Sequence, residues 1–163
     1  MRLITLSGGK HCKLDQVAMG LSENSDCTWI KPFTDKEYPP NTEDFQLDDY
    51  IHLNSSQLND KIMKEVPFAE SVVNGHRYVF FENQLVSGYC VIIADDRIVS
   101  YLKKNWDGEL ITVRCHCKTE EYSERCLLSD DEYDIVYDVD SDCIDELEEL
   151  VGDIYHYTEE DLL

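Results

Sequence analysis

Short apolar runs alternate along this chain with apolar residues spaced three or four apart, and the two patterns predict strands and helices in turn. The clearest run is YCVIIA at 89–94, a continuous stretch typical of a strand buried on both faces. The clearest helical spacing covers Ser55–Lys64, with Ser55 or Ser56 as the expected N-cap residue. The complete pattern predicts strands at 2–6, 27–30, 50–53, 70–73, 77–81, 89–94, 110–115 and 133–137, and helices at 15–21, 55–64, 97–104, 119–128 and 142–151.

The order of these elements divides the chain into an outer part and an insertion. Strands alternate with helices at both ends, which favours an α/β fold with a parallel sheet and helices on both of its faces. The middle is β-rich; within it, 31–49 is a polar, proline-bearing loop and Asn74-Gly75 predicts a hairpin turn. We therefore expect one domain over 1–163, an inserted subdomain over 31–85 and an acidic tail over 154–163.

Length and composition indicate a single folded domain. The chain has 163 residues, 42% of them apolar, which is enough for a sizeable core. We expect no signal peptide, and no apolar run approaches the roughly 18 residues of a membrane span. Seven cysteines, an odd number at irregular spacing, are expected to be reduced thiols. These features predict a soluble cytoplasmic protein.

Negative charge is the outstanding bulk property. Thirty-five acidic residues face fourteen basic ones, for a net charge of −21, which argues against direct binding to nucleic acid or to anionic membranes. From Ser129 to Leu163 there are fifteen acids and no Lys or Arg. This surface is either a solvated face or a site for a basic partner, such as a DNA-binding protein that accepts regularly spaced carboxylates in place of DNA phosphates. The candidate partner-binding residues on the predicted helix 142–151 are Asp142, Asp145, Glu146 and Glu149.

A glycine-bearing turn follows the first predicted strand, as in a phosphate-binding loop. The stretch 7–14 reads SGGKHCKL, whereas the loop pattern is G-x-x-x-x-G-K-[ST]. Without a gap, Gly8 takes the first glycine position, and Lys13, Leu14 and Asp15 replace the other defining residues. With one residue deleted, Lys13 becomes the loop lysine, but the two glycines and the hydroxyl residue are lost. Basic charge at Lys10, His11 and Lys13 remains in either register.

Four segments in order resemble guanylate kinase and its relatives. The most specific is FAESVVNGHRY at 68–78, which is similar to the family's Phe-x-Glu strand, Gly turn and Tyr. The family's Tyr-bearing strand is resembled by DDYIHLNSSQL. Its buried strand, which ends in acids beside the phosphates, is resembled by CVIIADD. Its closing strand and helix are resembled by EYDIVYDVDSDCIDELEEL. The opening MRLITLSGGKH also resembles phage deoxynucleoside monophosphate kinases.

The resemblance implies a P-loop-type fold and assigns remnant nucleotide-binding residues. Glu70 takes the place of the glutamate that accepts both donors of a guanine edge, a contact that one carboxylate can make as a fork. Tyr50 and Tyr78 take the places of the tyrosines that hold the phosphate of the bound nucleotide. The other residues implied are Gly8, Gly9, Lys10 and Lys13 in the loop, Lys36 at one of the family's arginine positions, and Asp95 after the buried strand.

The departures from the family predict impaired catalysis. Besides the altered loop, Pro39 replaces a second arginine, and the arginine-bearing lid is shortened or absent, with Arg125 alone in that region. Phosphoryl transfer depends on cations that neutralise the migrating group. We therefore assign no catalytic residues and no cofactor, and expect a protein that binds a protein partner, of which a viral inhibitor or DNA mimic is one form. The alternative is an active GMP or dGMP kinase, which would require ATP and Mg²⁺.

Cys115-His116-Cys117 invites comparison with a zinc site. A C-x-C pair on a strand puts both sulfurs on one face, and Cys126 could add a third ligand. The sequence has no second C-x-x-C pair and no spaced histidine pair, so we assign no metal site.

Overall fold

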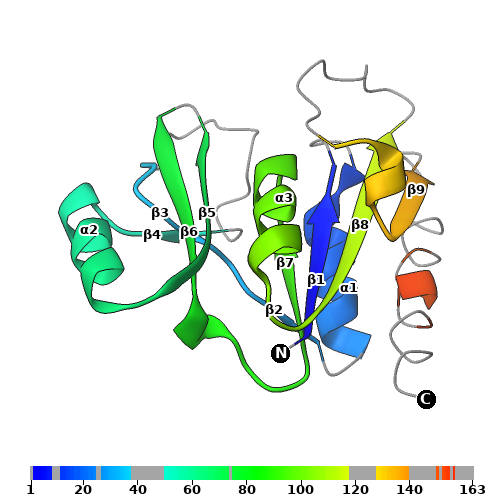
Figure 1. Cartoon of the computed structure of the whole chain (residues 1–163), viewed down its shortest axis with the longest axis horizontal. Coiled ribbons are helices and arrows are strands. Elements are labelled where there is room, and N and C mark those ends of the chain that lie inside the picture. Colours follow the sequence, from blue (N-terminus) through cyan, green and yellow to red (C-terminus); the bar gives the residue numbers. More distant parts are fainter. Residues whose placement is uncertain are drawn as a thin grey trace.

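A computed structural model of the chain describes residues 2–8, 12–24, 27–37, 50–73, 75–117, 128–139, 150, 152–154 and 156. Figure 1 shows two sheets with helix α3 between them. The larger sheet runs in the order β2-β7-β1-β8-β9, and every neighbouring pair in it is parallel. Its strands are β1 (Arg2–Ser7), β2 (Cys27–Trp29), β7 (Tyr89–Ile93), β8 (Glu109–Cys117) and β9 (Ile135–Val139). The predicted parallel sheet is confirmed.

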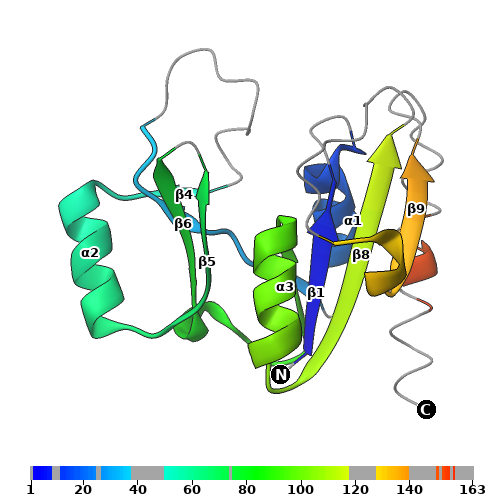
Figure 2. The same ribbon diagram turned by 45° about the horizontal axis from the view of Figure 1, so that its top comes forward.

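Helices cover both faces of this sheet because its strands are apolar on both faces. Helix α1 (Leu14–Asn24) packs on Ile4 and Leu6 of β1, in one core. Helix α3 (Asp96–Asn105) packs on Leu3 of β1 and Ile92 of β7, in a second core. Turning the molecule keeps α1 and α3 on opposite sides of β1, as Figure 2 shows.

The smaller sheet comes from the middle of the chain and runs in the order β4-β3-β6-β5. Its strands are β3 (Phe33–Thr34), β4 (Ile51–His52), β5 (Pro67–Val73) and β6 (His76–Phe81). Strands β5 and β6 are antiparallel, and Gly75 between them has φ of 81°, a backbone conformation that glycine adopts without strain. Helix α2 (Ser55–Lys64) covers one face through Leu58, and α3 lies against the other.

Most predicted bounds differ from the structure by a few residues, and three local differences have a bearing on the fold. The N-cap of α2 is Asn54 rather than Ser55 or Ser56, because Asn54 and Gln57 form a reciprocal capping box. The predicted loop at 31–49 contains β3, whose two residues pair with β4 and β6. Strand β9 begins at Ile135 rather than at the predicted residue 133, and the short helix η3 (Asp130–Glu132) precedes it.

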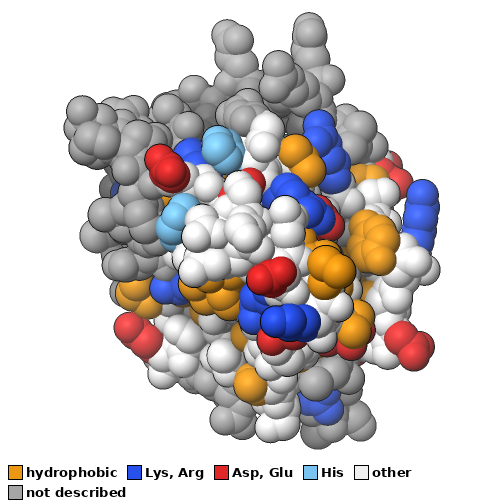
Figure 3. All heavy atoms as spheres, turned by 90° about the vertical axis from the view of Figure 1, so that its left-hand side faces the viewer, with side chains coloured by type: hydrophobic (Ala, Val, Ile, Leu, Met, Phe, Trp, Pro, Cys, Tyr) orange, Lys and Arg blue, Asp and Glu red, His pale blue; other side chains and the backbone are white. Residues whose placement is uncertain are grey.

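Charged side chains lie on the outer surfaces of both sheets. Seen from the side of α2, basic, acidic and hydrophobic side chains are interspersed (Figure 3). On the opposite side of the molecule, η3 and β9 carry the exposed acids Asp131, Glu132 and Asp138. Among the described helices, none is long and apolar enough to cross a membrane.

Candidate functional site

A cleft of about 160 Å³ lies where the carboxyl ends of β1 and β7 face β5 and β6. We call it the inter-sheet cleft. Ligands of open parallel sheets bind at this end of the strands, beside the point where the strand order reverses, which here is β1. The walls are mostly apolar, and the lining residues are Gly8, Trp29, Pro32, Ser71, Val73, Tyr78, Phe80, Ile93, Ala94, Asp95 and Ile98.

Asp95 is placed in the cleft by two structural hydrogen bonds. Its Oδ1 accepts from the N–H of Ile98 at 3.0 Å, so Asp95 is the N-cap of α3. Its Oδ2 accepts from the hydroxyl of Ser71 on β5 at 2.6 Å. Arg97 adds a second link between α3 and β5 by donating to the carbonyl oxygen of Val72 at 3.1 Å. The carboxylate therefore joins the two sheets as well as capping the helix.

The two predicted phosphate-binding tyrosines are brought together. Tyr50 and Tyr78 are both buried, and their rings meet edge to face at 6.3 Å between centroids. Tyr78 also lines the inter-sheet cleft, beside Ser71. The two tyrosines therefore lie in contact with each other, and their role in holding a phosphate stays a prediction.

Glu70 lies on the other face of β5. It pairs across the hairpin with Val79, which faces α2, whereas Ser71 pairs with Tyr78, which faces the cleft. The Glu70 carboxylate accepts from Nε of Arg77 at 2.6 Å, and this bond raises the pKa of the Arg77 guanidinium. The predicted guanine contact therefore requires Glu70 to leave Arg77 and turn toward the cleft.

Only part of the predicted phosphate loop lies within the described residues. Gly8 is at the cleft, and a Cβ added there would stand 2.9 Å from the carbonyl oxygen of Cys115, so close packing against β8 already requires glycine. Lys13 has φ of 51°, and Gly9 and Lys10 lie outside the described residues. Lys36 follows β3, where its N–H donates to Thr34 and its carbonyl oxygen contacts His52, and it does not line the cleft.

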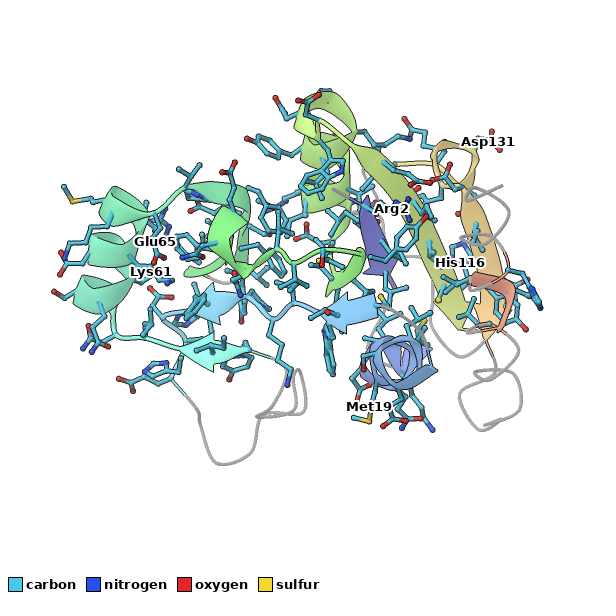
Figure 4. All side chains as sticks on the ribbon, turned by 90° about the horizontal axis from the view of Figure 1, so that it is seen from below. Arg2, Met19, Lys61, Glu65, His116 and Asp131 are labelled. Carbon is cyan, nitrogen blue, oxygen red and sulfur yellow. The ribbon has the colours of Figure 1, made fainter. Side chains whose placement is uncertain are left out.

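A buried polar network occupies the carboxyl end of β8, next to α3. Nη2 of Arg114 lies 2.8 Å from both carboxylate oxygens of Asp96, and Nη1 lies 3.1 Å from Oδ1 of Asp130. The hydroxyl of Tyr133 donates to Asp96 at 2.6 Å, and its ring lies under the guanidinium, 4.2 Å from Cζ. Nε2 of His116 contacts Asp130 at 2.8 Å. We call these five residues the Arg114 network. Figure 4 labels its member His116 and also Asp131, the residue that follows Asp130.

Mutual pairing shifts the pKa values of Asp96, Arg114 and Tyr133 in this network. Burial would raise the pKa of Asp96, but hydrogen bonds from Tyr133 and Arg114 outweigh it and hold the pKa below its ordinary value. Burial would lower the pKa of Arg114, and its bonds to Asp96 and Asp130 raise it instead. Burial and the bond to Asp96 raise the pKa of Tyr133 to about 12. Near neutral pH the network therefore holds the Arg114 cation against the ionised carboxylate of Asp96.

Sequence reasoning missed the Arg114 network. The sequence feature that could have predicted it is the arginine inside the apolar strand run LITVRC. A charge buried in a strand needs a partner of opposite charge. The partner, Asp96, comes directly after the Asp95 that the family resemblance singled out.

The side chains of the candidate zinc ligands Cys115 and His116 lie in different environments. Cys115 is buried in the core beside α1, where burial raises its pKa to about 12. His116 faces the other way, into the Arg114 network. No group of three metal-ligating residues occurs within the described ranges. The candidate partner-binding residues Asp142, Asp145, Glu146 and Glu149 lie outside the described residues, as do Cys126 and Arg125.

Similarity to known proteins is found at the level of structure. No protein-family model and no curated protein matches the sequence. Among solved structures, the chain is similar to the crystal structure of guanylate kinase from Anaplasma phagocytophilum, with a TM-score of 0.69 and 13% sequence identity. The match covers 98% of this chain and 85% of that chain. The chain has a guanylate kinase-like fold. The P-loop-type architecture that the sequence predicts is thereby confirmed.

Proposed function

We propose that this chain uses a guanylate kinase-like fold to bind a basic protein partner through its acidic surface, and that it does not transfer phosphoryl groups. One observation carries the second half of this proposal. Among the described lining residues of the inter-sheet cleft, the charged side chain is a carboxylate, Asp95, and none is a cation. A nucleotide phosphate placed there would meet negative charge.

The described arginines are all engaged elsewhere. Arg2 pairs with Glu109 at 3.5 Å, Arg77 with Glu70, and Arg97 with a backbone carbonyl of β5. Arg114 lies at the carboxyl end of the larger sheet, where ligands of parallel sheets bind, but it is already paired with Asp96 and Asp130. Because phosphoryl transfer relies on positioned cations, this arrangement favours a protein that has lost the reaction.

The acidic surface supports the binding half of the proposal. The segment from 129 onward has fifteen acids and no Lys or Arg, and its described part places Asp131, Glu132 and Asp138 on the surface. Such a surface attracts a basic partner and repels nucleic acid. A protein that imitates DNA to occupy a DNA-binding protein, as a viral inhibitor does, is the form that this charge fits best.

A kinase assay tests the first half. Coupled measurement of ADP release from ATP with GMP or dGMP and Mg²⁺ should show no turnover, with a known guanylate kinase as the positive control. Turnover near the usual kinase range of about 1–100 s⁻¹ would overturn the proposal.

Binding to purified basic DNA-binding proteins tests the second half. Complexes should form at 50 mM salt, weaken at 500 mM salt and be displaced by duplex DNA, because both conditions act on electrostatic attraction. Charge reversal at Asp142, Asp145 and Glu149 should reduce binding, whereas reversal of Glu23, an exposed acid on α1 outside the acidic segment, should not. Binding that is unchanged by salt concentration and by added duplex DNA would show that the negative charge serves solubility alone.

An active nucleoside monophosphate kinase is the second candidate. The guanylate kinase neighbour favours it, as does Tyr78, which lines the cleft and contacts Tyr50. In that case GMP should bind, and Glu70→Gln should weaken the affinity. GMP binding that Glu70→Gln leaves unchanged would remove Glu70 from the site.

A further inference from the structure

A second hollow, of about 380 Å³, lies away from the inter-sheet cleft, beside the last turn of α3. Its size falls within the ~300–1,000 Å³ range of ligand sites. Phe68 of β5 and Tyr101 and Trp106 from the end of α3 form its aromatic wall. Glu82, at the start of η2 (Glu82–Gln84), and Asp107 contribute its charges. We call it the aromatic hollow.

The charge of the aromatic hollow has a single sign. Its charged lining residues are the exposed carboxylates Glu82 and Asp107. Lys103, on the same helix, turns away and donates to the carbonyl oxygen of Glu132. Lys104 is exposed and does not line the hollow. A cationic group in the hollow would therefore meet two carboxylates and no lining cation.

The aromatic rings favour a flat cation. Phe68 and Trp106 meet edge to face at 5.6 Å, which holds the Trp106 ring in place. The Trp106 indole is further fixed by a hydrogen bond from Nε1 to the carbonyl oxygen of Glu109 at 3.1 Å. Tyr101 is half exposed, so one ring is open to a visiting group. Guanidinium groups stack on such rings and form forked bonds with carboxylates, which an ammonium cannot do.

We propose that the aromatic hollow binds an arginine side chain presented by the basic partner protein. This inference rests on the proposed function, since it names a residue of that partner. It places one point of contact on the described surface, separate from the inter-sheet cleft.

The test uses a capped Gly-Arg-Gly peptide, with the matched Gly-citrulline-Gly peptide as the neutral control. The chain has two tryptophans, so a Trp29→Phe background leaves Trp106 as the reporter of the hollow. Titration should shift Trp106 fluorescence saturably, with an affinity of about 1 mM or better for the arginine peptide. The citrulline peptide should bind at least about threefold more weakly, as expected for loss of an exposed charge pair.

Variants of the hollow separate it from the rest of the surface. Glu82→Gln with Asp107→Asn should weaken arginine binding about tenfold, and Tyr101→Ala about threefold, since each exposed pair or ring contributes modestly. Glu23 lies on α1, on the other face of the larger sheet, and Glu23→Gln should leave the affinity for the arginine peptide unchanged. These exposed positions should not disturb folding, which circular dichroism checks.

Two results would overturn the inference: equal binding of the citrulline peptide, or no loss in the double variant. Salt-sensitive binding to basic proteins would then still support the proposed function. Phosphotransferase activity would instead overturn the proposed function while the peptide titration remained informative about the hollow.

Discussion

Two arginines, one on each sheet, are paired with carboxylates in opposite surroundings. The Arg114 side chain is 5% exposed and that of Asp96 15%. The side chains of Arg77 and Glu70, on the smaller sheet, are each 35% exposed. The same chemical pair is therefore locked into the fold at one site and close to solvent at the other. The difference implies that the Arg114 pair should contribute more to the stability of the fold than the Arg77 pair, which solvent screens.

Removing the buried guanidinium should have the largest effect. Arg114→Met leaves Asp96 and Asp130 without their cation, and breaking such a buried pair costs about 3–5 kcal/mol of the free energy of unfolding. Urea denaturation followed by circular dichroism measures the loss.

A double variant sharpens this first prediction. Arg114→Met with Asp96→Leu should be less destabilised than Arg114→Met alone, because the orphaned carboxylate is also gone. A loss below about 1 kcal/mol in the single variant would show that the network is not structural.

Alkaline pH should lower the free energy of unfolding through the same network, by an amount between the effects of Arg114→Met and Arg77→Met. Folding raises the pKa of Tyr133 from an ordinary value of about 10 to about 12, so its contribution is complete below pH 10. Between pH 10 and 12 the unfolded chain loses this proton while the folded chain keeps it, and about 2–3 kcal/mol of stability is lost.

Tyr133→Phe is the matched control, since it keeps the ring beside Arg114 and removes the titrating hydroxyl. The stability of wild type should fall more steeply than that of the variant across this pH range. Parallel curves for the two proteins would mean that Tyr133 titrates alike in the folded and unfolded states.

The exposed pair should show the smallest effect. Arg77→Met should change the free energy of unfolding by no more than about 1 kcal/mol, because solvent screens a pair this exposed. The same urea denaturation measures it. A loss as large as that of Arg114→Met would remove the distinction between the two sites.

The sequence alone determined the order of the elements. Periodicity predicted the buried strand at 89–94, the helix at Ser55–Lys64 and the hairpin around Gly75, because each signal is local. The family resemblance predicted the P-loop-type architecture. It also assigned one role to Tyr50 and Tyr78, whose contact only the structure shows. It also marked Asp95, although its bonds to Ser71 and Ile98 could not be foreseen.

Tertiary structure decided which way the key charges point. The pairing of β5 with β6 is irregular between Pro67 and Ala69, and Phe68 and Ala69 are both buried. A shift of one residue in the pairing register moves every side chain of a strand to its other face. This irregularity therefore decides whether the side chain of Glu70 or that of Ser71 faces the cleft. The partners of Arg114 were equally invisible, since Asp96 and Asp130 reach it from 18 and 16 residues away in the chain. Local pattern fixes an element, but only packing against distant residues fixes the surroundings of a charge.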